Sequence, residues 1–172
     1  MDQIQNLIVE IEELKNEQKF SRAIELLEKS IMRYHSDYRL YEELADIYLY
    51  RGELDKGLKS ANFALDLNED SATGNYLKGF ILLSQDKVRE AIFYLEKSNK
   101  MLGNNPEVLR NLGWAYTMIH QSERGISLLK RALNLAPGDE LISEDLAMAL
   151  IGIGKIAEGN TLLQKIGKNI VT

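Results

Sequence analysis

The sequence has no cysteine, only two prolines and no long hydrophobic run, and each shortage excludes a class of protein. Without cysteine there is no disulfide framework, no thiol nucleophile and no thiolate zinc site. The longest weakly polar stretch, residues 146–154, is too short to span a bilayer. So few prolines, in a chain whose apolar residues recur three and four positions apart, predict an all-helical protein.

The charges are mixed, and no region is strongly basic. A net charge of -5 without any run of Lys and Arg lacks the basic footprint typical of nucleic-acid or membrane-surface binding. The first residues also lack the basic and apolar segments of a secretory signal. We therefore expect a cytoplasmic protein that binds no nucleic acid and does not insert into membranes.

What the sequence does contain is an internal repeat of 34 residues. Small and large side chains recur at this step, and the small ones indicate where two helices pack closely. Four ladders share one register: Ala23, Gly57, Ala91, Gly125 and Gly159; Ile11, Ala45, Gly79, Gly113 and Ala147; Ser30, Ala64, Ser98, Ala132 and Ile166; and Leu14, Tyr48, Leu82, Tyr116 and Leu150. Each unit is therefore interpreted as a helix A, a short turn and a helix B.

Helix start signals separate the units. Asn and Asp cap exposed amides, and Pro is tolerated at the first helical position because its missing N–H would be unpaired there. The signals are Ser36-Asp37, Asp70-Ser71, Asn105-Pro106 and Pro137-Gly138-Asp139. They predict a single repeat domain over residues 1–172, with units at about 4–37, 38–71, 72–105, 106–139 and 140–172.

This pattern resembles the tetratricopeptide repeat (TPR) family over essentially the whole chain. The fourth unit matches best, with Leu112-Gly113, Tyr116, Gly125, Leu129, Ala132 and Pro137 at the family's spacing. The resemblance implies an all-α fold, a right-handed superhelical stack of antiparallel helix pairs, that serves as a non-enzymatic protein-binding scaffold. Two departures concern local packing: Ile11 stands where Gly or Ala is expected, and Lys78 stands where Leu is usual.

No constellation of residues indicates catalysis, a metal or a cofactor. The two histidines, His35 and His120, lie in unlike contexts and are interpreted as helix-end and turn residues. Residues 152–157 match the dinucleotide pattern G-x-G-x-x-A, but that motif requires a preceding strand, and none is predicted. We interpret these glycines as a turn between two helices.

A second stripe of side chains on the A helices is the candidate binding site. If these helices line the concave surface, as the family resemblance implies, the stripe is polar and acidic in the first two units and aromatic and Met-rich in the last three. Trp114 is the predicted anchor, and Arg110 would fix the direction of an extended ligand. The alternative is that these side chains pack on one another. The predicted partner-binding residues are Tyr76, Phe80, Leu83, Arg110, Trp114, Met118, Met148 and Ile151.

The predicted ligand is an apolar or amphipathic segment of a partner protein, bound in the concave groove. Chaperone-binding members of the family hold a terminal carboxylate with Lys and Asn, but the matching positions here are Ile8, Glu12, Glu43, Thr73 and Leu77. Polar residues at Asn6, Glu10 and Glu13 predict an uncovered outer face on the first helix. The last helix offers Leu162, Leu163 and Ile166, which favours either homo-oligomerisation through this end or through the groove, or a tail that folds back over it.

Overall fold

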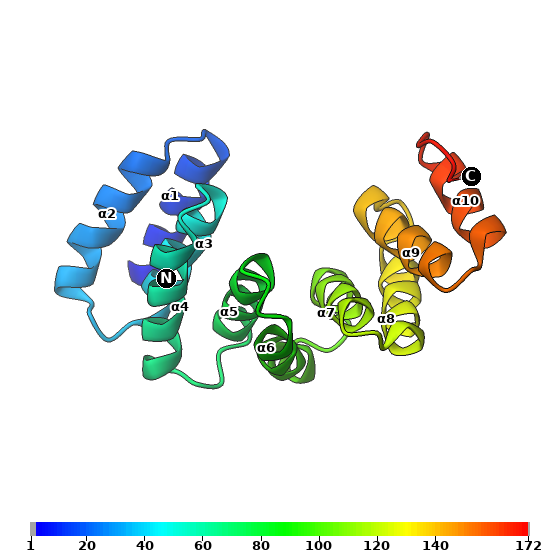
Figure 1. The fold of residues 1–172 in the computed structure, drawn as a ribbon. Helices are drawn as coiled ribbons and strands as arrows, with labels where there is room; N and C mark the ends of the chain where they lie inside the picture. The colour runs from blue at the N-terminus through cyan, green and yellow to red at the C-terminus, as the bar shows by residue number, and fades with distance from the viewer. Residues whose placement is uncertain (1–2, 172) are drawn as a thin grey trace. The chain divides into compact units, whose positions relative to one another are not determined.

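The computed structural model describes residues 3–171, which form ten α-helices and no β-strand (Figure 1). The predicted all-α fold is confirmed. The chain divides into two compact units: unit 1 comprises residues 1–85 with α1–α5, and unit 2 comprises residues 86–172 with α6–α10. That the five repeats form a single domain stays a prediction. The helices are α1 (Gln3–Asn16), α2 (Phe20–Arg33), α3 (Tyr38–Tyr50), α4 (Leu54–Leu67), α5 (Ala72–Ser84), α6 (Val88–Met101), α7 (Pro106–Met118), α8 (Ser122–Leu135), α9 (Glu140–Gly152) and α10 (Ile156–Lys165).

The predicted start signals cap the A helices. Asp37, Ser71, Asn105 and Asp139 each accept a hydrogen bond from a backbone N–H in the first turn of α3, α5, α7 and α9, and Pro106 is the first residue of α7. These caps satisfy amides that the helix itself leaves unpaired. The predicted start signals therefore lie at the beginnings of four A helices, while the bounds of the five units stay a prediction.

Every turn between helix A and helix B contains one residue with a left-handed backbone, always at the same repeat phase. These residues are Gln18, Gly52, Asp86, His120 and Gly154, with φ between 57° and 83°. The interpretation of His120 and Gly154 as turn residues is thus confirmed. No strand precedes residues 152–157 in the part of the chain that the structure describes.

The helix pair α7/α8 in unit 2 packs through glycines. A Cβ atom added at Gly113 would lie 2.9 Å from Leu129 Cγ and 3.0 Å from the carbonyl oxygen of Gly125. One added at Gly125 would lie 2.5 Å from the carbonyl oxygen of Gly113. Since real Cβ atoms do not approach so closely, the backbones of α7 and α8 touch at a place where only glycine fits. Close crossings are predicted at Gly79 and Gly113; the one at Gly113 is confirmed, and the one at Gly79 stays a prediction.

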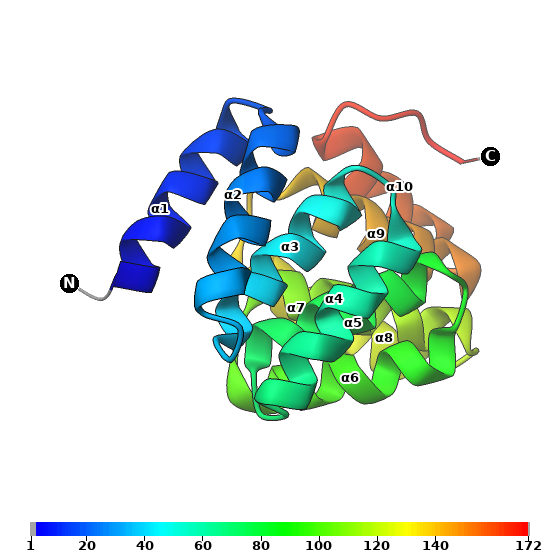
Figure 2. The ribbon, with the colours of Figure 1, turned by 90° about the vertical axis from the view of Figure 1, so that its left-hand side faces the viewer.

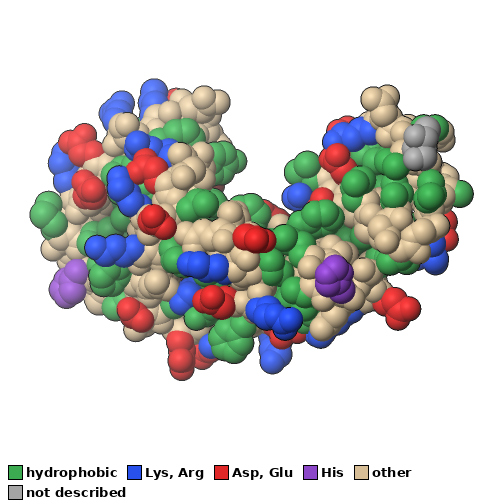
Figure 3. Space-filling model, in the orientation of Figure 1, with side chains coloured by type: hydrophobic (Ala, Val, Ile, Leu, Met, Phe, Trp, Pro, Cys, Tyr) green, Lys and Arg blue, Asp and Glu red, His purple; other side chains and the backbone are tan. Residues whose placement is uncertain are grey.

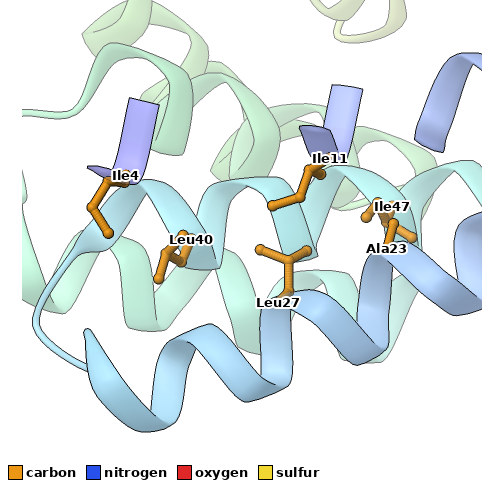
Figure 4. Packing of buried hydrophobic residues seen from close by; sticks show 6 residues of the cluster. All are labelled: Ile4, Ile11, Ala23, Leu27, Leu40 and Ile47. Carbon is orange, nitrogen blue, oxygen red and sulfur yellow. The ribbon is translucent and has the colours of Figure 1, made fainter. Parts of the chain in front are cut away.

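The helix pair α1/α2 in unit 1 packs differently. Ile11 holds the position that Gly113 has in α7, and its side chain is fully buried. It packs with Leu27 of α2 and Leu40 and Ile47 of α3, as Figure 4 shows. Because this larger side chain lies where a glycine would allow contact, α1 and α2 approach each other along a shorter length than α7 and α8 do.

Beyond α10 the C-terminal segment folds back along that helix. The Asn160 amide nitrogen donates to the carbonyl oxygen of Val171 at 2.9 Å, and its oxygen accepts from the Val171 N–H at 2.9 Å. Lys168 pairs with Glu144 of α9. Leu163 is buried beneath this region. These contacts agree with the expectation of a tail that folds back.

Candidate partner-binding surface

Within each unit the A helices of successive repeats are neighbours (Figures 1 and 2). In unit 1, α3 lies beside α1 and α5, and in unit 2, α7 lies beside α9. The eight predicted binding residues all lie on these helices, and none of them is buried. We call those of each unit its helix-A surface. In unit 1 it comprises Tyr76, Phe80 and Leu83 on α5; in unit 2 it comprises Arg110, Trp114 and Met118 on α7 with Met148 and Ile151 on α9.

In unit 1 the helix-A surface is aromatic on α5. The rings of Tyr76 and Phe80 lie 6.1 Å apart between centroids, tilted by 34°, and both side chains are partly exposed. On α3, the Tyr50 side chain is 73% exposed and stacks on Phe20 of α2. An aromatic pair held in one turn of a helix offers a rigid apolar contact area, because little side-chain freedom is left to lose on binding.

The acidic character predicted for this face in unit 1 is partly offset by a lysine. Lys15 of α1 lies 2.5 Å from Asp46 and 3.1 Å from Glu43 of α3. Burial opposes the charge on Lys15, but the hydrogen bond to Asp46 and the charge of Glu43 outweigh it and raise its pKa. Burial raises the pKa of Glu43, although Lys15 partly offsets this effect. These groups bind α1 to α3, and the single cation of Lys15 offsets only part of their negative charge.

Glu42, which the sequence places on the same stripe, is buried instead. Its side chain is 7% exposed and accepts a hydrogen bond from the Ser71 hydroxyl, whose oxygen also caps α5 through the Gly74 N–H. Burial raises the pKa of Glu42, and the hydrogen bonds from Ser71 and Gly74 only partly offset this effect. Glu42 therefore ties α3 to α5 and is unavailable to a basic partner.

In unit 2 the exposed part of the helix-A surface is apolar. Met118 is 39% exposed and Met148 is 45% exposed, and Leu141 at the start of α9 is 55% exposed. Trp114 lies one turn before Met118 on α7 and is partly exposed. Met and aromatic side chains together form a surface that can adapt to more than one apolar partner.

Arg110 has a partner that sequence reasoning missed. Its Nε lies 2.5 Å from Asp145 Oδ2 on α9, with both side chains about three-quarters covered. Burial raises the pKa of Asp145, and the hydrogen bond and charge of Arg110 partly offset this effect. Asp145 has the repeat phase of Glu43, which pairs with Lys15 in unit 1. In each unit an acidic residue at this phase therefore pairs with a cation on the preceding A helix, although Lys15 and Arg110 have different phases.

One of the predicted residues, Ile151, faces a helix B. A Cβ atom added at Gly159 of α10 would lie 2.5 Å from Ile151 Cγ1, and one added at Gly125 of α8 would lie 2.6 Å from Thr117 Cγ2. Leu83 of α5 has the same repeat phase as Thr117 and Ile151. Ile151 is therefore at least partly occupied by packing within its own repeat.

Two further features are absent from the described residues. Residues 3–171 contain no group of three or more His, Asp or Glu side chains arranged to hold a metal ion. None of the helices in that range is both long and apolar enough to cross a membrane. Figure 3 shows acidic and basic side chains interspersed over the visible face of each unit.

Comparison with known proteins connects this architecture to repeat proteins. No family model matches the chain. A segment of 113 residues is 26% identical to the Hsp70-Hsp90 organizing protein of Triticum aestivum, covering 66% of this chain but only 19% of that protein.

Solved structures with the same fold cover most of the chain. PilW, described as a widely conserved type IV pilus biogenesis factor, is 21% identical with a TM-score of 0.86, covering 96% of this chain and 77% of its own. MamA from Desulfovibrio magneticus RS-1 is 17% identical with a TM-score of 0.81, covering 96% and 94%. YrrB, described as a TPR protein with an unusual peptide-binding site, is 23% identical with a TM-score of 0.71, covering 80% and 71%.

Proposed function

We propose that the chain is a non-enzymatic scaffold of the tetratricopeptide-repeat type, whose helix-A surface binds an apolar or amphipathic segment of a partner protein. One observation carries the proposal: Met118 and Met148 remain exposed on neighbouring A helices, beside the partly exposed Trp114. Contiguous exposed apolar surface is uncommon on proteins without an interaction role. Residence in the cytoplasm stays a prediction, which fractionation would check.

The ligand is expected to be apolar rather than strongly basic. The acidic groups of unit 1 are engaged by Lys15 or buried, and Arg110 is engaged by Asp145. Hence shape and apolar contact supply most of the affinity on this surface. Positions Ile8 and Thr73 also lack the basic and amide side chains that a carboxylate clamp requires.

Trp114 gives the direct test. Partner binding should shift the fluorescence of this single tryptophan, and Trp114→Ala should weaken binding by about 2 kcal/mol, since tryptophan side chains near the centre of an interface dominate binding energy. Circular dichroism should show unchanged helical content. Unchanged affinity in the folded variant would refute the proposal.

The alternative is a self-assembling scaffold that uses its C-terminal end or the helix-A surface for identical copies. Ile170 is 49% exposed and Val171 is 38% exposed, which favours this reading, but the Asn160 contacts cover part of α10 with the tail. Light scattering over a concentration series tests it: a strict monomer at high concentration excludes assembly as the main role.

A further inference from the structure

Unit 1 contains an apolar pocket away from the helix-A surface. It has a volume of about 460 Å³ and lies between α2 and α4, with α3 as its floor. Tyr41 and Tyr48 with Leu44 line it from α3, and Phe63 lines it from α4. The Tyr41 and Phe63 rings stack at 5.8 Å between centroids, which gives the pocket one aromatic wall.

The floor of this pocket consists of positions that are core elsewhere in the chain. The residues of α7 at the same repeat phases are Leu109, Leu112 and Tyr116, which are 0%, 2% and 3% exposed. Their counterparts on α3, residues 41, 44 and 48, are all partly exposed. The cause is the looser placement of α2, which approaches α3 along a shorter length than α6 approaches α7.

In unit 2 three side chains connect the corresponding helices α6, α7 and α8, and we call this group the lock. The Tyr116 hydroxyl of α7 donates to a carboxylate oxygen of Glu96 on α6. Arg124 of α8 lies 2.7 Å from the same carboxylate, with its guanidinium carbon 4.0 Å from the Tyr116 ring centroid. A hydroxyl and a cation thus converge on one carboxylate.

Unit 1 holds the same three positions in an open arrangement. Glu28, Tyr48 and Lys56 lie two repeats before Glu96, Tyr116 and Arg124. Lys56 lies 5.3 Å from the Tyr48 ring centroid but pairs with Glu53 at 2.6 Å. Within residues 3–171, neither Glu28 nor the Tyr48 hydroxyl has a hydrogen-bond or ion-pair partner. The hydroxyl and the cation are therefore in place without their carboxylate.

A second cation adds positive charge to the α4 side of the pocket. Lys59 follows Lys56 by one turn on α4, lines the pocket, and has no ion-pair partner among the described residues. The α4 rim therefore offers two amines, while the α2 rim offers the carboxylate of Glu28 and the apolar side chain of Ile31. A carboxylate from outside would meet Lys59 and the Tyr48 hydroxyl, as Glu96 meets Arg124 and Tyr116 in unit 2.

From this geometry we infer that the pocket between α2 and α4 is a second docking site, which takes a partner segment with a bulky apolar side chain next to carboxylates. The apolar side chain lies on Tyr41, Leu44 and Phe63, and the carboxylate lies toward α4. This site is separate from the helix-A surface, because it is lined by α2, α3 and α4 and shares no residue with that surface.

The test uses the full chain and three blocked pentapeptides: Ala-Phe-Asp-Glu-Ala, its uncharged Asn-Gln analogue and its basic Lys-Lys analogue. Two-dimensional NMR titration of the acidic peptide should shift resonances of α2, α3 and α4. The uncharged peptide should bind about threefold more weakly, as expected for an exposed ion pair. The basic peptide should bind more weakly still.

Matched variants locate the binding. Phe63→Ala should weaken binding of the acidic peptide about tenfold through lost apolar contact, whereas Phe93→Ala, at an exposed aromatic on α6, should leave it unchanged. Glu28→Gln should tighten binding, because it removes the carboxylate that competes for the α4 rim. Lys59→Glu should weaken it, and Lys130→Glu on α8 should not.

Several outcomes would overturn the inference. They are absence of saturable shifts with the acidic peptide, preference for the basic peptide, and equal affinity in a folded Phe63→Ala variant. A dimer in sedimentation that Phe63→Ala dissociates would assign the pocket to a second copy of the chain instead. Because the helix-A surface is untouched by these variants, failure here leaves the Trp114 test unaffected.

Discussion

The first and fourth repeats have the same plan but opposite packing. In α7/α8, Gly113 and Gly125 let the two backbones touch, and the Glu96–Tyr116–Arg124 lock ties three helices together. In α1/α2, Ile11 fills the equivalent place with a side chain. The residue at one position of the repeat pattern therefore decides how closely the two helices of a pair approach each other.

The largest effect is expected at the tight crossing. Gly113→Leu should destabilise the protein by roughly 1–3 kcal/mol or more, because its side chain would collide with Leu129 and the backbone of α8. Ile11→Leu is the control at the same phase in α1, and as a volume-conserving change it should cost less than about 1.5 kcal/mol. Urea denaturation measures both. Equal losses would refute the packing difference.

A smaller difference in stability is expected between variants that remove the tyrosine hydroxyl from the lock of unit 2 and from its open counterpart in unit 1. Tyr116→Phe removes the hydroxyl that donates to Glu96 and should cost about 1 kcal/mol or somewhat more, as for a hydrogen bond to a charged group. Tyr48→Phe removes a hydroxyl without a partner in the described residues and should stay within about 0.5 kcal/mol of wild type. Thermal unfolding measures the loss of stability in both variants. A loss in Tyr48→Phe comparable to that in Tyr116→Phe would mean that the Tyr48 hydroxyl has a hydrogen-bond partner in solution.

The smallest effect concerns the buried carboxylate that joins α3 to α5. Because burial raises the pKa of Glu42, ionisation of this side chain lowers the free energy of unfolding. The contribution of protonated Glu42 is fully present below the unfolded-state pKa of about 4.3 and is lost as the pH rises through the folded-state pKa. Glu42→Gln cannot ionise. The free energy of unfolding of the variant relative to wild type should therefore increase from about pH 4 to pH 7, by less than about 1 kcal/mol. A decrease over this range would contradict the assignment.

Much of the fold could be predicted from the sequence, because the period of 34 residues, the caps and the small residues are local signals. Even the two departures have local meaning. Ile11 marks the looser pair, and Lys78 is tolerated because its neighbour Leu77 occupies the core. Packing rules act on neighbouring side chains, so they are visible in a repeat pattern.

The side-chain partners could not be predicted in the same way. Glu42 is buried, Arg110 is engaged by Asp145 and Ile151 lies over Gly159, and each depends on a contact with another helix. Periodicity assigns a residue to a helix face but does not tell which side chain across the interface will reach it. The open lock of unit 1 was similarly hidden, although Glu28, Tyr48 and Lys56 share their phases with Glu96, Tyr116 and Arg124.

The central claim is that partners bind the helix-A surface, and the most direct measurement is quantitative partner capture by three forms of the full chain. Immobilised wild type, Phe80→Ala/Trp114→Ala and the control Phe93→Ala would be compared after circular dichroism has shown equal helical content. The account predicts that partners retained by wild type and Phe93→Ala are lost from the double variant. Undiminished retention of those partners by the folded double variant would contradict it.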